Sequence, residues 1–192
     1  YEKAIALKPK PNSRLEDTYV KQVLKVAKLY YDGDKVEMND ERANELFHIV
    51  AEYGEAEAYH MLGLQYYNGY GVDEDEEVGI YWFRKAAEAG HRTAMVHLGY
   101  MYENGLGVRK NIAKAFEFYK KAAEMGDDHS MRVLASKYQL GQGCEKDVTM
   151  AIRWYKKALA KGNMQVGFRL GDIYLNGEDV DIDSDLAVEY YE

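Results

Sequence analysis

The sequence predicts an all-α fold in which antiparallel helix pairs stack into a solenoid. The first observation is a strict period, because glycines recur in steps of 36 residues at Gly54, Gly90, Gly126 and Gly162. The second is that one tyrosine column keeps the same step, at Tyr30, Tyr66, Tyr102, Tyr138 and Tyr174. The third is that apolar residues inside each period follow helical spacing. A period of about 20–50 residues is typical of repeat proteins, in which no unit can bury its apolar face alone.

The first half of each period predicts a helix. In the unit that starts near residue 55, Ala58, Leu62 and Tyr66 follow one another at four-residue steps on one face. The column of Gly63 holds only glycine or alanine, at Ala27, Gly63, Gly99, Ala135 and Gly171. Glycine in a helix costs roughly 0.5–1 kcal/mol relative to alanine. Its repeated use therefore predicts that another helix crosses there at close range.

The second half of each period predicts a loop and a second helix. Asn68 and Gly69 form a helix C-terminal signal. The next helix has an N-cap residue in every unit, at Asn39, Asp75, Asn111, Asp147 and Asp183. Its apolar face combines large aromatic side chains with alanines, as in Trp82, Phe83 and Ala86. Each unit is therefore predicted to be one antiparallel helix pair.

This register predicts five units, at about 19–54, 55–90, 91–126, 127–162 and a truncated 163–192. Residues 1–18 contain a short helical pattern, out of phase with the period, that ends at Pro9 and Pro11. We interpret them as the end of a preceding helix and a linker. Because the chain begins at Tyr1 and stops within a helical pattern, it is expected to be part of a longer protein.

Two segments resemble a known family. Residues 94–108, AMVHLGYMYENGLGV, resemble the opening of a Sel-one-like repeat (SLR), and residues 113–126, AKAFEFYKKAAEMG, resemble its close. Residues 1–9 are similar to the end of a tetratricopeptide repeat. The resemblance implies a right-handed, tetratricopeptide-like α-solenoid that acts as an adaptor or scaffold for protein complexes. It brings no shared catalytic motif.

Composition narrows the choice of partners. The 192-residue chain has a formal net charge of −8, which argues against a nucleic-acid or anionic-membrane partner. No apolar run reaches the roughly 18–20 residues that a membrane span needs. The single cysteine, Cys144, cannot form an intrachain disulfide and fits a reducing compartment such as the cytoplasm. A periplasmic or secreted location stays open, and the sequence does not predict an oligomeric state.

No group of residues predicts chemistry. Asp181, Asp183 and Asp185 alternate like the ligands of a calcium loop, but Leu186 stands where such a loop needs glycine. The repeat register explains these residues as a loop and an N-cap. The five histidines are interpreted as surface residues that share no face, and no metal-ligand spacing links them. The sequence therefore predicts no enzyme, no cofactor and no bound metal.

The predicted function is the binding of a protein or peptide partner along a concave groove lined by first helices. The candidate residues are first-helix positions outside the packing columns, which vary from unit to unit. We call them the first-helix surface: Tyr31, His60, Leu64, Tyr67, Val96, Tyr100, Glu103, Arg132, Ser136, Gln139, Phe168 and Asp172. The alternative is a bacterial envelope-associated or secreted repeat protein that binds a glycan or a host protein, because exposed aromatic side chains could stack on sugars.

Overall fold

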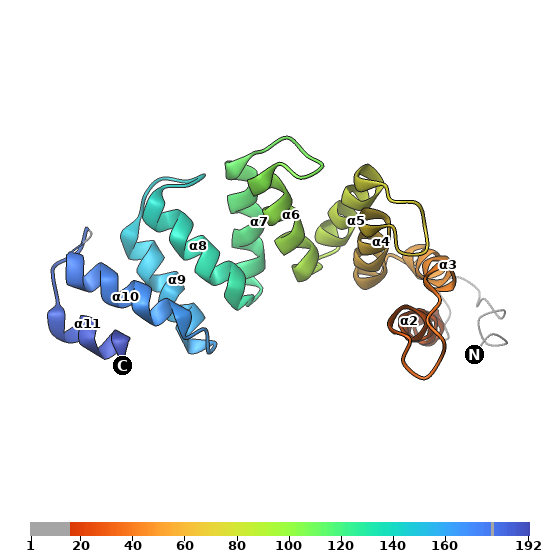
Figure 1. Cartoon of the computed structure of the whole chain (residues 1–192), viewed down its shortest axis with the longest axis horizontal. Helices are drawn as coiled ribbons and strands as arrows, with labels where there is room; N and C mark the ends of the chain where they lie inside the picture. The colour runs from red at the N-terminus through yellow and green to blue at the C-terminus, as the bar shows by residue number, and fades with distance from the viewer. Residues whose placement is uncertain (1–15, 178) are drawn as a thin grey trace. The chain divides into compact units, whose positions relative to one another are not determined.

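The structure of the protein is a computed structural model that describes residues 16–177 and 179–192 (Figure 1). These residues form ten α-helices and no strand. The chain divides into two compact units, residues 1–94 and 95–192. Most of the predicted segment at 1–18, including the helix that ends at Pro9, lies outside the described residues.

Unit 1 contains two helix pairs. They are α2 (Glu16–Asp32) with α3 (Asp40–Ala51), and α4 (Ala56–Asn68) with α5 (Glu76–Glu88). Helices α3 and α4 also pack on each other, so the two pairs share a core. Val23 of α2, Leu46 of α3 and Leu62 of α4 are buried in one cluster. Each pair thus buries its apolar face against the next pair, as a stacked repeat requires.

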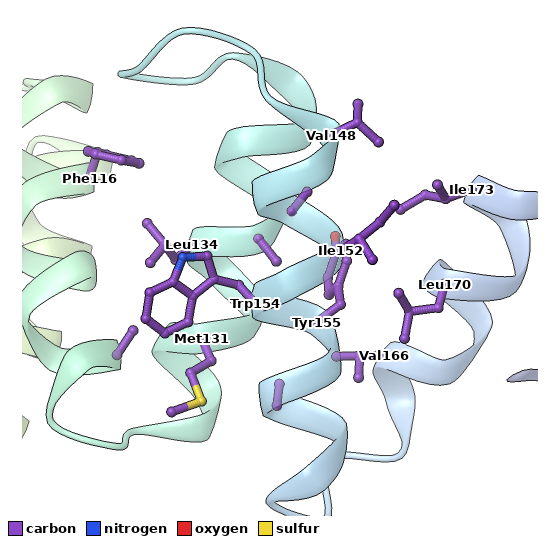
Figure 2. Close-up of a cluster of buried hydrophobic side chains, with 14 residues drawn as sticks. Phe116, Met131, Leu134, Val148, Ile152, Trp154, Tyr155, Val166, Leu170 and Ile173 are labelled. Carbon is purple, nitrogen blue, oxygen red and sulfur yellow. The ribbon is translucent and has the colours of Figure 1, made fainter. Parts of the chain in front are cut away.

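Unit 2 continues the same alternation. Its helices are α6 (Arg92–Asn104), α7 (Ile112–Glu124), α8 (Asp128–Leu140), α9 (Val148–Ala160), α10 (Gln165–Asn176) and α11 (Ser184–Tyr191). Figure 2 shows how α9 joins its neighbours. Trp154 extends toward Leu134 of α8, whereas Tyr155 lies on the side of α10, near Leu170.

The loops between paired helices share one construction. In every pair whose N-cap the sequence predicts, the N-cap side chain accepts a hydrogen bond from the backbone N–H three residues later. The backbone N–H of the same residue donates to the carbonyl of the periodic tyrosine, as from Asn111 to Tyr102 at 2.8 Å. The five predicted N-caps are therefore confirmed. In each loop the N-cap residue binds both the start of the second helix and the periodic tyrosine at the end of the first helix.

The glycine column lies at a close helix contact, as the sequence predicts. A Cβ atom added to Gly63 would lie 2.6 Å from the ring of Phe83, and one added to Gly99 would lie 3.0 Å from the ring of Tyr119. In both cases the aromatic ring belongs to the second helix of the same pair. The missing side chain of the first helix thus makes room for the aromatic side chain of the second.

Replacing Gly99 with leucine is expected to lower the free energy of unfolding by about 1–3 kcal/mol, because the side chain would overpack against Tyr119. Gly99→Ala is the control, since alanine occupies the same column at Ala27 and Ala135. Thermal or urea unfolding followed by circular dichroism measures both variants. A leucine variant that unfolds like the parent would contradict the close contact.

Candidate interaction surface

The first-helix surface is divided between the two units. Tyr31, His60, Leu64 and Tyr67 lie on α2 and α4 in unit 1. The other eight residues lie on α6, α8 and α10 in unit 2. Each unit is therefore described separately below.

The two tyrosines of unit 1 pack inside their own helix pairs. The Tyr31 ring meets the Phe47 ring edge-on at 6.2 Å between centroids, and the Tyr67 ring lies 6.2 Å from that of Phe83. Burial, together with the negative charges of nearby groups, raises the pKa of Tyr31, so its hydroxyl stays protonated at neutral pH. Both side chains are half-buried, so each one stabilises its own helix pair and remains partly accessible to solvent.

His60 differs from the expectation, because its side chain is only 8% exposed. Its ring stacks on that of His91 with centroids 4.3 Å apart. The interpretation of the histidines as surface residues that share no face is therefore wrong for this pair. The reason is that His91 caps α6: its Nδ1 accepts from the backbone N–H of Ala94 at 3.2 Å, which fixes the ring beside α4.

A polar chain continues outward from His91. Nε2 of His91 donates to Glu57 at 2.9 Å, and Nζ of Lys28 donates to the other carboxylate oxygen of Glu57 at 2.5 Å. Burial alone would raise the pKa of Glu57, but the hydrogen bonds and charges of Lys28 and His91 lower it below its usual range. Neighbouring helix pairs of unit 1 are thus joined by polar contacts as well as by the core.

In unit 2, Glu103 is the centre of a second polar network. Its carboxylate accepts from Nζ of Lys137 at 2.6 Å and from the hydroxyl of Tyr119 at 3.1 Å. The Lys137 side chain is 2% exposed and that of Glu103 is 31% exposed. Burial and the charge of Glu103 raise the pKa of Tyr119, so the hydroxyl remains a donor. The network ties α8 to the preceding helix pair.

The position of Glu103 has a matching residue in most pairs. Where the second helix presents Tyr155, the first helix presents the acceptor Gln139, 3.2 Å from the hydroxyl. Where it presents Phe47 or Phe83, the first helix presents Tyr31 or Tyr67. In the last pair Leu175 occupies this position, and Asp172, three residues earlier, accepts from the hydroxyl of Tyr191 at 2.9 Å. Several residues of the predicted surface therefore also hold their own helix pair together.

Two residues of the predicted surface are strongly exposed. Tyr100 of α6 is 55% exposed and Phe168 of α10 is 63% exposed. Val96, Arg132 and Ser136 are half-buried. The candidate residues do not include Leu140, nor Leu175, which shares the column of Glu103 and Gln139; both are exposed at the ends of α8 and α10. Their apolar character and position near the first-helix C-termini could have indicated them.

A hollow of about 450 Å³ lies elsewhere in unit 2. It is lined by Ala123, Glu124, Met131, Trp154, Lys157, Ala160 and Lys161, none of which belongs to the predicted surface. Nζ of Lys157 lies 3.9 Å from the centre of the indole of Trp154 and thus covers one face of the ring. The hollow is therefore a lysine-rimmed depression between helix ends.

Within residues 16–177 and 179–192, no three His, Cys, Asp or Glu side chains come together as a metal site would require. Asp183 caps α11 through the backbone N–H of Leu186, and Asp179 pairs with Lys146 at 2.7 Å. Cys144 donates to the carbonyl of Lys137, and burial raises the pKa of its thiol.

The helices of the described part of the chain are too short or too polar to cross a membrane.

Comparison with known protein families gives the same match in five successive segments of the chain. The model of the Sel1 repeat matches the chain at residues 24–52, 56–91, 93–127, 129–163 and 168–192. The chain belongs to the Sel1 repeat family. Proteins of this family generally mediate protein–protein interactions, and the family is typically a non-catalytic scaffold. No curated protein matches the chain at a significant level.

Solved structures agree with this assignment. A protective antigen present in uropathogenic Escherichia coli strains, which displays an SLR fold, is 31% identical with a TM-score of 0.85. The similarity covers 90% of this chain but 37% of that protein, so the chain spans little more than a third of its length. A Sel1 repeat protein from Oxalobacter formigenes is 30% identical with a TM-score of 0.77, over 97% of this chain and 75% of its own.

A more distant likeness concerns the fold alone. Cysteine-rich protein B of Helicobacter pylori is 22% identical with a TM-score of 0.50, over 82% of this chain and 97% of its own. The all-helical solenoid fold and the family predicted from the sequence are thus confirmed. The unit boundaries and the first-helix surface stay predictions.

Proposed function

We propose that this chain is a non-catalytic scaffold that binds a protein or peptide partner along the exposed face of its first helices. The observation that carries the proposal is the exposure of Tyr100 and Phe168 on α6 and α10. Large aromatic side chains are costly to leave in water, and Tyr is enriched among residues that dominate interfaces. Membership of a repeat family that generally mediates protein–protein interactions supports the same function.

The form of the surface suggests how such a partner would bind. Within each unit the candidate residues are spread over consecutive first helices at equivalent positions, so an extended segment could contact several repeats of one unit. Affinity would come from many small contacts, with a few anchors dominating. In unit 2 we assign the anchors to Tyr100, Arg132 and Phe168. Tyr67 is a weaker choice, because its side chain is half-buried whereas that of Phe168 is exposed.

Replacing Tyr100, Arg132 and Phe168 together with alanine is expected to weaken partner binding at least about tenfold, or roughly 1.4 kcal/mol. The partner would be isolated with the full-length protein, and its affinity measured by isothermal titration calorimetry. The three side chains are exposed or half-buried, so the helical circular dichroism spectrum is expected to stay unchanged.

A charge-reversed variant of the second helices provides the control. Arg84, Lys120 and Lys156 form a basic column on α5, α7 and α9. If their replacement with glutamate abolishes binding while the alanine variant binds normally, the partner uses the second helices and the proposal is wrong.

A second candidate function is the binding of a glycan, at the bacterial envelope or after secretion. It is supported by an aromatic cluster in unit 1, in which the exposed Tyr81 meets Trp82 edge-on and Tyr59 of α4 stacks on Trp82 with ring centroids 5.7 Å apart. The relative from uropathogenic Escherichia coli is a protective antigen, which is compatible with an envelope role. Binding to a glycan array that is lost in Tyr81→Ala would favour this function over the scaffold.

A further inference from the structure

The first helices of unit 2 differ in charge from the chain as a whole. The chain has a formal net charge of −8. Helices α6, α8 and α10 carry four basic residues and three acidic ones, a balance of +1: Arg92, Arg132, Lys137 and Arg169 against Glu103, Asp128 and Asp172. These first helices are therefore close to neutral, unlike the acidic chain as a whole, whereas the second helices α7 and α9 carry six basic residues and two acidic ones.

The acidic side chains on these helices are already engaged. Glu103 forms an ion pair with Lys137, which cancels its charge. Asp172 accepts from the hydroxyl of Tyr191, and Asp128 lies in the first turn of α8, where the helix dipole offsets a negative charge. The carboxylates of the first helices in unit 2 are thus held by groups of the unit itself.

Two guanidinium groups on the same helices are not held in this way. Within the described residues, neither Arg132 nor Arg169 has a carboxylate partner. Arg132 makes a polar contact on its own helix, with Nη2 3.4 Å from Nδ1 of His129. Arg169 is exposed. Arg132 occupies the position of Phe168 one repeat earlier, and Arg169 follows Phe168 in the sequence.

Exposed apolar side chains accompany these arginines. Tyr100, Leu140, Phe168 and Leu175 are all exposed on α6, α8 and α10. Tyr and Arg are enriched among the residues that dominate binding interfaces. Unit 2 therefore presents positive charge and apolar surface on the same set of helices.

We propose that unit 2 binds an acidic partner segment in which Asp or Glu residues alternate with aromatic or aliphatic ones. The inference rests on the proposed scaffold function and adds the chemistry of the partner. Arg132 and Arg169 bind carboxylates of the segment, because a guanidinium can donate two parallel hydrogen bonds to one carboxylate. Tyr100 and Phe168 bury its apolar side chains.

A displayed library of random peptides, selected against the whole chain, tests this proposal. The expected result is enrichment of sequences that combine Asp or Glu with an aromatic or aliphatic residue. For a selected peptide, Arg132→Glu with Arg169→Glu is expected to raise the Kd at least about tenfold. Added salt is expected to weaken binding to the parent, since exposed ion pairs are screened. A selection against the charge-reversed variant should no longer enrich acidic sequences.

A matched control makes the same change of charge elsewhere in unit 2. Lys120→Glu with Arg153→Glu alters basic residues on the second helices α7 and α9 and is expected to leave the Kd unchanged. Selected peptides that are basic or neutral would contradict the acidic partner but not the scaffold function. The same conclusion would follow if the selected peptides bind the Arg132 and Arg169 variant normally while Tyr100→Ala with Phe168→Ala abolishes binding. If no peptide is enriched, or binding survives both changes, the scaffold function at this surface is overturned as well.

Discussion

Replacing Glu103 with alanine is expected to lower the free energy of unfolding by about 2–4 kcal/mol, whereas replacing Lys137 with methionine changes it by less than about 1 kcal/mol. The two residues form one ion pair, so the difference comes from what each change leaves behind. Loss of Glu103 leaves the ammonium of Lys137, on a side chain 2% exposed, without its carboxylate partner. A buried charge without a counter-charge is strongly unfavourable.

Loss of Lys137 costs less free energy, because the partner that remains is Glu103. Glu103 is 31% exposed, so water can solvate its carboxylate, and the hydroxyl of Tyr119 still donates to it. Methionine fits the site, because Met101 is buried at the equivalent position one repeat earlier. Urea unfolding of the single variants and of Glu103→Ala with Lys137→Met measures these differences. The double variant is expected to recover most of the stability lost in Glu103→Ala.

The next repeat supplies a matched control. Gln139 occupies the position of Glu103 and accepts from Tyr155, but Ile173 stands where Lys137 would be. Gln139→Ala should therefore cost only about 1 kcal/mol, the contribution of one hydrogen bond. Equal losses in Gln139→Ala and Glu103→Ala, or a large loss in Lys137→Met, would contradict the asymmetry.

The fold could be predicted from the sequence because it is repeated. Each structural requirement appears several times, so the columns of small residues, tyrosines and N-caps stand out against variable positions. The burial of Lys137 could not be predicted from its residue type, since lysine is almost always at the surface. Its column contains Leu29, Gln65, Met101 and Ile173, and that mainly apolar set is the signal that indicates a buried site.

The candidate site was less predictable for a physical reason. Some first-helix residues outside the core columns pack on the second helix of their own pair, and others are exposed to solvent. A single sequence does not separate these two groups. Glu103 and Gln139 vary with the second-helix side chain that they contact. Tyr100 and Phe168 are exposed, but the Phe168 ring also lies 6.2 Å from that of Tyr191 on its own second helix. His60 was misplaced because its burial depends on His91, a residue from the next repeat. A contact between repeats involves two residues from different columns, so neither column alone indicates which side chains become buried.

Replacing Gly143 with alanine is expected to lower the free energy of unfolding by about 2–5 kcal/mol, whereas Gly141→Ala in the same loop costs about 1–2 kcal/mol. Both glycines have positive φ, 83° and 67°, so both variants carry the strain of a left-handed backbone. They differ in what the new Cβ would meet. At Gly143 it would lie 2.6 Å from the carbonyl oxygen of Ile112, whereas at Gly141 the nearest atom, Cβ of Lys146, is 3.4 Å away.

The close approach, and not the backbone conformation alone, accounts for the expected difference. Lys35 and Asp179 occupy the position equivalent to Gly143 in other repeats with φ of 66° and 52°, so a side chain can adopt this conformation. At Gly143, however, the neighbour is the backbone of the first residue of α7, in the preceding helix pair, and a backbone carbonyl has little freedom to move. Urea unfolding of the two alanine variants gives the comparison. Equal losses would mean that the loop can shift away from α7, and that this glycine is required only for its conformation.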